Sequence, residues 1–362
     1  MTRRWLLLAF VAGNLVSLLV LPKLWRSDPE AELALARSVS RRLLAHPDRL
    51  FYRTGNARFD GQSAIAIHQM AILGLAQLVL ERPDTKGELL PAMRSGADRL
   101  VDPQTLTYAA SVYGQHGVVG MKPGQGHAYL GYVNLALGAL RLVDPKTPHA
   151  KLHDRLSREL GTRLFESPTG MIETYPGETW PPDVAAVAGS VGLHARITGG
   201  DRGPLDAWAA RFAGCAIHSS GYLVQRLKSG TCEPLDAPRG SGTAVAAYFL
   251  SFSHPELSRR LHDALLERSL LGFGGIREYA PGFSGDGDVN AGPIVLGVSV
   301  GASGFAIGAA RANGDEELGR ELYRTAYLFG LPADRGDERT FAAGGMLGNA
   351  LLLAMLTARP HS

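Results

Sequence analysis

Acidic and aromatic side chains gather in one short segment of the sequence, Glu173–Asp183, which reads ETYPGETWPPD. Paired carboxylates in a partly apolar site can divide into an acid and a base, because burial or a like charge raises one pKa while the other group stays ionised. Glu178 and Asp183 are the best candidates for such a pair on this segment. The alternative is a capped loop, since Pro181, Pro182 and Asp183 also suit the start of a helix.

Five further segments repeat this arrangement, each ahead of an apolar helical pattern: 58–62, 122–127, 231–240, 277–288 and 334–339. They add other acids, a histidine and an arginine to the candidates. We expect the catalytic residues to be Asp60, His127, Glu178, Asp183 and Asp288. We expect the substrate-binding residues to be Tyr175, Trp180, Asp236, Arg239, Glu278 and Tyr279.

Several of these side chains have more than one possible role. His127 could carry a proton within the site, or it could be a core histidine that donates to a carbonyl. Tyr175, Trp180 and Tyr279 could form an apolar wall or stack on a sugar, and Arg239 could hold a carboxylate or neutralise an acid. The sequence contains no phosphate loop, dinucleotide fingerprint or metal-ligand spacing, so neither a cofactor nor a metal is expected.

The elements that must position these residues are helices. Charged, amphipathic patterns alternate with patterns that are apolar nearly all round and rich in Gly, Ala and Ser, and a helix that is apolar on every face must be buried. The patterns predict an all-α fold, an (α/α)6 toroid in which an outer ring surrounds an inner ring whose helices all run the same way. The six segments would then open into one cup. The helical patterns cover 30–46, 62–82, 86–100, 127–143, 147–165, 183–198, 203–215, 240–253, 255–270, 291–312, 315–329 and 342–357.

Two features of this pattern allow other interpretations. Residues 170–175 and 221–225 are expected to form short β-hairpin pieces within the loops. The long apolar patterns near 293–310 and 342–356 could be membrane spans, but their glycines and polar residues favour inner helices of a toroid.

The N-terminal segment is typical of a membrane anchor. Residues Trp5 to Leu21 carry no charge, Arg3 and Arg4 precede them, and the run is near the lower length limit for a spanning helix. A cleaved signal peptide is the alternative, although no clear cleavage site follows. We therefore expect residues 1–27 to be an anchor or signal segment, and 28–362 to be a single toroid domain on the periplasmic side of the membrane.

Composition and cysteine count limit the remaining possibilities. The net charge of +3 is small and evenly spread, so no nucleic-acid partner is expected. The partners expected are a small-molecule or glycan substrate, and the membrane through the N-terminal helix. Cys215 and Cys232 are the only cysteines; in an oxidising compartment they could pair, or they could be two unpaired buried residues.

Three places in the sequence resemble the linalool dehydratase/isomerase family. Gly126-His127-Ala-Tyr-Leu resembles the family's Gly-His start of an inner helix, Thr174–Asp183 matches a family segment in length and position, and the next helix, ending at Gly199, agrees in register. The resemblance implies an α/α barrel, a catalytic role for His127 and an early acid at Asp60. Thr174 and Asp183 stand where the family has its two cysteines, so the resemblance implies an acid/base site rebuilt with carboxylates.

Three functions are consistent with this cup. The first is a cofactor-independent lyase or isomerase that uses His127 with Asp60, Glu178 and Asp183. The second is a glycoside hydrolase or another sugar-processing enzyme, which rests on analogy between folds. The third is a non-catalytic protein that binds a cell-envelope glycan or lipid.

Overall fold

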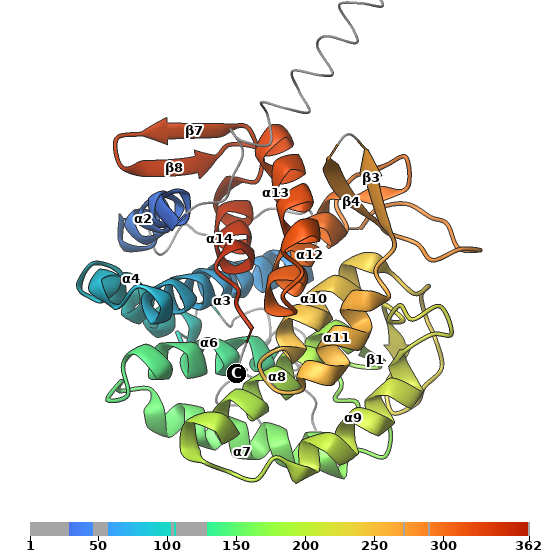
Figure 1. The fold of residues 1–362 in the computed structure, drawn as a ribbon. Helices are drawn as coiled ribbons and strands as arrows, with labels where there is room; N and C mark the ends of the chain where they lie inside the picture. Colours follow the sequence, from blue (N-terminus) through green and yellow to red (C-terminus); the bar gives the residue numbers. More distant parts are fainter. Residues whose placement is uncertain are drawn as a thin grey trace, which may run out of the picture.

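The structure is a computed structural model that describes residues 29–45, 57–102, 105, 129–270, 272–288 and 290–360. Twelve α-helices lie within these ranges, and they alternate between outer and inner positions (Figure 1). The inner helices are α3 (Ala57–Glu81), α6 (Leu130–Val143), α8 (Pro181–Thr198), α10 (Gly240–Leu250), α12 (Val300–Ala312) and α14 (Gly345–Leu356). The outer helices are α2 (Pro29–Ala45), α4 (Lys86–Leu100), α7 (Ala150–Glu166), α9 (Gly203–Ala216), α11 (Pro255–Asp263) and α13 (Glu316–Gly330).

The inner helices form a closed ring. Each packs against the next in the order α3, α6, α8, α10, α12 and α14, and α14 packs against α3. Small residues allow the close approach that this ring needs. A Cβ at Gly189 of α8, for example, would lie 2.4 Å from the backbone oxygen of Phe249 on α10. The predicted all-α toroid is therefore confirmed.

One described helical stretch, Gly61–Glu81 within α3, is long and apolar enough to cross a membrane. Its most apolar window is 83% buried inside the structure, which identifies it as a core helix of the ring. The predicted anchor at residues 1–27 lies outside the described residues.

Two helix predictions extended over residues that form strands. The pattern at 255–270 ends as a helix at Asp263, and β3 (Glu267–Leu270) pairs with β4 (Phe273–Arg277). The pattern at 291–312 becomes helical only at Val300, because β5 (Ile294–Val295) and β6 (Val298–Ser299) form a hairpin before it. Leu296 and Gly297 make its two-residue turn with φ of 53° and 82°, the left-handed geometry that such hairpins use.

The remaining strands are short hairpins between helices. β1 (Glu178–Thr179) pairs with β2 (Leu227–Lys228), just after the strand pieces expected at 170–175 and 221–225. Within the expected ranges, Tyr175, Leu223 and Val224 form isolated β-bridges. Residues 334–339, expected as a loop, belong to the hairpin of β7 (Pro332–Arg335) and β8 (Glu338–Phe341). The first predicted loop, 58–62, falls inside α3. Helix α3 therefore begins about one turn earlier than its apolar pattern.

The two cysteines form a disulfide. Cys215, near the end of α9, is bonded to Cys232 in the segment that leads to α10. The bond closes a loop with a sequence separation of 17 residues. It ties that segment to the outer ring and resolves the alternative that the sequence left open.

Candidate active site

A small cavity lies at the N-terminal ends of the inner helices. Its volume is about 140 Å³, and all six inner helices and three connecting segments contribute to its walls. This follows from the toroid, because all six helices begin at the same end of the ring. The lining residues comprise a polar group (Gln62, Ser63, Gln69, Tyr132, Tyr175, Trp180, Asp183, Gln225, Ser241 and Asn290) and a group that is apolar or small (Ala66, Met70, Pro182, Gly242, Val245, Phe249, Phe305, Leu347 and Leu351).

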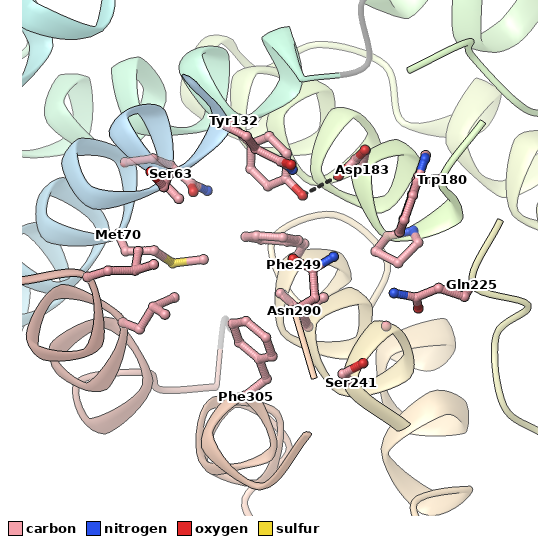
Figure 2. A pocket seen from close by; sticks show the side chains of 18 of the residues that line it. Ser63, Met70, Tyr132, Trp180, Asp183, Gln225, Ser241, Phe249, Asn290 and Phe305 are labelled. Carbon is pink, nitrogen blue, oxygen red and sulfur yellow. Dashed lines mark hydrogen bonds between the residues drawn. The ribbon is translucent and has the colours of Figure 1, made fainter. Parts of the chain in front are cut away.

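Asp183 is the acidic residue that lines this cavity within the described ranges. Pro181 and Pro182 form the first turn of α8 with Asp183, and only 4% of Asp183 is exposed. Its Oδ1 accepts a hydrogen bond of 2.5 Å from the hydroxyl of Tyr132 on α6 (Figure 2). The side chain of Thr174 makes a second hydrogen bond to the carboxylate.

Burial raises the pKa of Asp183 to about 6. The hydrogen bonds from Tyr132 and Thr174 act in the opposite direction, because they favour the charged form, and the nearby charge of Glu178 raises the pKa further. A carboxyl group with this pKa is partly protonated near neutral pH. Asp183 can therefore donate a proton in one step of a reaction and accept one in another.

Aromatic and amide side chains stand beside Asp183. The hydroxyl of Tyr175 donates to Oε1 of Gln62 at 3.2 Å, and the backbone N–H of Trp180 donates to the hydroxyl oxygen of Thr174 at 3.0 Å. Figure 2 shows Trp180 and Gln225 on one side of the cavity and Met70 on the other. The cavity thus has a polar, aromatic wall that faces an apolar one.

Glu178, the proposed partner of Asp183, does not line the cavity. It lies in β1, and its Oε2 accepts a hydrogen bond of 2.8 Å from Arg226. The segment Glu173–Asp183 turns between these two acids, so it directs one toward the cavity and the other toward Arg226. The expected pair on this segment therefore contributes a single carboxyl group to the cavity.

Five other candidates form an ion cluster next to the cavity, centred on Arg239. The guanidinium lies 3.2 Å from Asp236, 3.4 Å from Asp288 and 3.9 Å from Glu278, and it stacks 5.1 Å from the ring centroid of Tyr279. We call Asp236, Arg239, Glu278, Tyr279 and Asp288 the Arg239 cluster.

Ser241 connects the Arg239 cluster to the cavity. Its hydroxyl donates to Oε1 of Glu278 at 2.7 Å, and its backbone N–H donates to Oε2 of the same carboxylate. Glu278 is fully buried, and burial raises its pKa. The cluster therefore fixes the start of α10, whereas Ser241 is its contact with the cavity wall.

Two predicted residues cannot be placed at the cavity from the described side chains. Asp60 lies in the first turn of α3, two positions before the lining residue Gln62, but its side chain is outside the description. His127 lies outside the described residues.

Sequence reasoning missed Tyr132 and the lining amides Gln62, Gln69, Gln225 and Asn290. A signal for part of this set was present. Gln62, Ser63 and Gln69 interrupt a mainly apolar helical pattern, and their spacing places them with Ala66 on one face. A polar side chain on a buried helix face needs a partner, and here that face lines the cavity.

One described group has the composition of a metal site. The candidate ligand atoms of His153, Asp154 and His194 lie within 4.8 Å of one another. The guanidinium of Arg141 contacts Asp154 Oδ1 at 2.5 Å and His153 Nδ1 at 3.4 Å. A positive group thus already occupies this position, and none of these residues lines the cavity.

No family model matches the chain, and no curated protein matches it. Solved structures with the same architecture include the GH76A α-1,6-mannanase from Salegentibacter sp. HEL1_6, with 12% identity, a TM-score of 0.54, and coverage of 88% of this chain and 98% of that one. A second is an inactive variant of the mannanase, with two consecutive aspartates replaced by asparagine, in complex with α-1,6-mannotriose. It has 13% identity, a TM-score of 0.51, and coverage of 89% of this chain and 99% of that one.

At these identities the similarity establishes the fold. The resemblance to linalool dehydratase/isomerase is not supported by the comparisons. The chain therefore has the helical toroid architecture seen in glycoside hydrolases of the GH76 type.

Proposed function

We propose that this protein is an enzyme that cleaves glycosidic bonds, with Asp183 as its general acid. The observation that carries the proposal is the buried carboxyl group of Asp183, which faces the cavity with a pKa of about 6. A general acid must hold its proton until the leaving oxygen develops charge, and burial supplies that property. The toroid likeness to a mannanase, one form of which holds α-1,6-mannotriose, supports a glycan as the substrate class.

In the proposed reaction, protonated Asp183 donates its proton to the glycosidic oxygen as the bond to the anomeric carbon breaks. The Tyr132 hydroxyl then stabilises the carboxylate that remains, through the 2.5 Å hydrogen bond to Oδ1. Trp180 and Tyr175 offer aromatic surfaces on which a sugar ring can stack. The proton returns to Asp183 from the water that completes hydrolysis.

Glycoside hydrolysis ordinarily requires a second carboxylate. The mannanase was inactivated by replacing two consecutive aspartates, whereas this sequence contains no two aspartates in succession. The second acid must therefore come from another segment. Asp60, in the first turn of α3 ahead of Gln62, is the candidate we propose.

The test compares wild-type protein with Asp183→Asn on α-1,6-mannan and a panel of other neutral glycans, with released reducing ends as the measurement. We expect the substitution to lower turnover by about 10²–10⁴-fold, and the wild-type rate to fall as pH rises through about 6. Asp286→Asn, on an exposed loop, is the matched control and should keep wild-type turnover. Equal turnover of Asp183→Asn and wild type, or no release from any glycan, would contradict the proposal.

A second candidate function is favoured by one specific observation, the apolar wall formed by Met70, Phe249, Phe305, Leu347 and Leu351. A lyase or isomerase acting on a small alcohol could use Asp183 to protonate the departing hydroxyl. It would then need a base to remove a proton from the adjacent carbon, a role proposed for His127. Loss of water from a tertiary allylic alcohol, with no activity on glycans, would favour this function.

We infer that the toroid domain lies outside the cytoplasm, anchored by the apolar N-terminal run. The Cys215–Cys232 disulfide supports an oxidising compartment. Because the native cysteines are paired, a new cysteine at exposed Arg42 (Arg42→Cys) would be the reactive thiol. We expect a membrane-impermeant thiol reagent to label it on intact spheroplasts, and labelling only after lysis would contradict the inference.

A further inference from the structure

Two buried amide side chains in the cavity wall have polar atoms without a hydrogen-bond partner among the described residues. Gln69 is fully buried, and neither its Oε1 nor its Nε2 has a partner within the described part of the chain. Gln225 is 1% exposed and its Oε1 lacks a partner. Native proteins satisfy almost all buried polar groups, so each exception calls for an explanation.

The position of Gln69 makes a ligand the natural partner. It lies two helical turns beyond Gln62 on the same face of α3, next to Met70, so it belongs to the deep end of the cavity. Gln225 lies on the side wall, and Figure 2 shows its amide nitrogen directed toward the interior of the cavity. The two amides therefore flank the space into which Asp183 projects.

The charge of the wall restricts what can bind. The described lining residues include one carboxyl group, that of Asp183, and no lysine, arginine or histidine. Arg239 does not line the cavity, and three carboxylates surround it. Among the described lining residues, an anionic ligand would therefore meet a carboxyl group and no cation. A neutral ligand carries no charge that has to be removed from water when it enters the cavity.

The size of the cavity restricts the ligand further. A volume of about 140 Å³ is close to that of an engineered cavity that holds one benzene molecule. The cavity can therefore enclose one six-membered ring. A side-chain amide presents its N–H donor and its oxygen acceptor side by side. Two adjacent hydroxyl groups can pair with both, because one hydroxyl accepts from the N–H while the other donates to the oxygen.

We propose that Gln69 and Gln225 select a single neutral ring that carries adjacent hydroxyl groups, with the amide of Gln69 binding a vicinal diol at the deep end of the cavity. This inference rests on the proposed glycan-cleaving function and specifies its substrate as a neutral sugar unit. Uronic acids and other anionic sugars are excluded, and alcohols with one hydroxyl group leave the Gln69 amide half satisfied.

The first arm of the test requires no substrate. Gln69→Leu removes a buried amide that has no hydrogen-bond partner among the described residues, so the melting temperature without ligand should stay unchanged or rise. The matched control is Gln77→Leu, two turns further along α3. Gln77 contacts the Ala354 carbonyl, the Thr357 hydroxyl and the Tyr248 hydroxyl, so its loss should lower the melting temperature. An equal loss in both variants would overturn the assignment of Gln69.

The second arm measures ligand binding by thermal shift and calorimetry with three probes: methyl α-mannoside, the corresponding methyl mannuronide, and cyclohexanol. We expect wild type to bind the mannoside, with at least about tenfold weaker binding of the other two. Gln69→Leu and, independently, Gln225→Leu should each weaken mannoside binding by about tenfold or more. Binding of the mannuronide as tight as that of the mannoside, or no binding of the mannoside, would overturn the proposal.

The two arms separate this inference from the proposed function. If Asp183→Asn keeps its turnover while Gln69→Leu loses mannoside binding, the proposed acid is wrong and the binding site stands. If Asp183→Asn abolishes turnover while Gln69→Leu binds and melts as wild type does, the acid stands and the role of Gln69 is overturned.

Discussion

Two buried carboxyl groups at one end of the toroid, Asp183 and Glu278, have similar surroundings and different charge partners. Asp183 is buried in the first turn of α8 and accepts a hydrogen bond from the Tyr132 hydroxyl. Glu278 is buried against the first turn of α10 and accepts a hydrogen bond from the Ser241 hydroxyl. Burial raises the pKa of both. Glu278 has the Arg239 guanidinium 3.9 Å away, whereas no cation contributes to the shift of Asp183.

This difference separates a structural acid from one available for chemistry. Arg239 favours the charged form of Glu278 and partly offsets its burial, so the Arg239 cluster holds α10 in place. Asp183 titrates near the pH at which proton transfer is useful, and it faces the cavity. A perturbed pKa indicates function more strongly when it arises from burial beside a cavity than when it belongs to an ion network.

The largest effect on stability is expected from Arg239→Met. The substitution leaves Glu278, Asp236 and Asp288 close together without their shared cation. Removing one partner of a buried ion network costs about 3–5 kcal/mol, which urea denaturation can measure. Lys228→Met breaks the exposed pair with Glu233 and should cost less than about 1 kcal/mol. Equal losses in the two variants would remove the distinction between the Arg239 cluster and surface pairs.

A smaller effect is expected in the pH dependence of stability. The folded-state pKa of Asp183 is about 6, raised from 3.8, so the folded state binds this proton more tightly than the unfolded state. Its stabilising contribution is fully present below pH 3.8 and is lost as pH rises through about 6, a change of about 3 kcal/mol. Asp183→Asn should lack this change. The free energy of unfolding of wild type should therefore fall relative to that of Asp183→Asn between pH 4 and pH 7. Parallel pH dependences of the two proteins would contradict the raised pKa of Asp183.

The smallest effect is expected from Tyr132→Phe. Because the Tyr132 hydrogen bond lowers the pKa of Asp183, its removal should raise that pKa. The alkaline limb of the pH–rate profile should then move to higher pH. Tyr248→Phe, which removes another buried hydroxyl from a residue outside the cavity lining, is the control and should leave the limb in place. If the alkaline limb of Tyr132→Phe stays in place or moves to lower pH, a group other than Asp183 determines that limb.

The fold could be predicted from the sequence because alternation between charged and apolar helices is a local, repeated signal. The errors occurred where that signal is ambiguous. The run from Ile294 to Ser299 is apolar enough for an inner helix, but its β-branched residues and the left-handed turn at Leu296 and Gly297 form a hairpin. Periodicity alone does not separate these alternatives in a short apolar run.

The site could be predicted only in part. The composition of Glu173–Asp183 indicated three of the four residues that line the cavity from that segment, namely Tyr175, Trp180 and Asp183; the fourth is Pro182. The division of the acids between the cavity and the two arginines, Arg226 and Arg239, depends on distances between segments far apart in the chain. Sequence patterns do not contain those distances. The lining glutamines are neutral and carry no signal of acid or base chemistry, and Gln69 lies within helix α3 and not in one of the six segments.

The closure of the inner ring has a consequence for biosynthesis. Helix α3 packs against α14, and Gln77 is bonded to Ala354 and Thr357, more than 270 residues further along the chain. Glu32 of α2 is likewise paired with Arg311 and Arg359. During synthesis from the N-terminus, the apolar face of α3 emerges long before the helix that covers it. The apolar surface of α3 that packs against α14 must therefore stay uncovered in the growing chain until α14 leaves the ribosome.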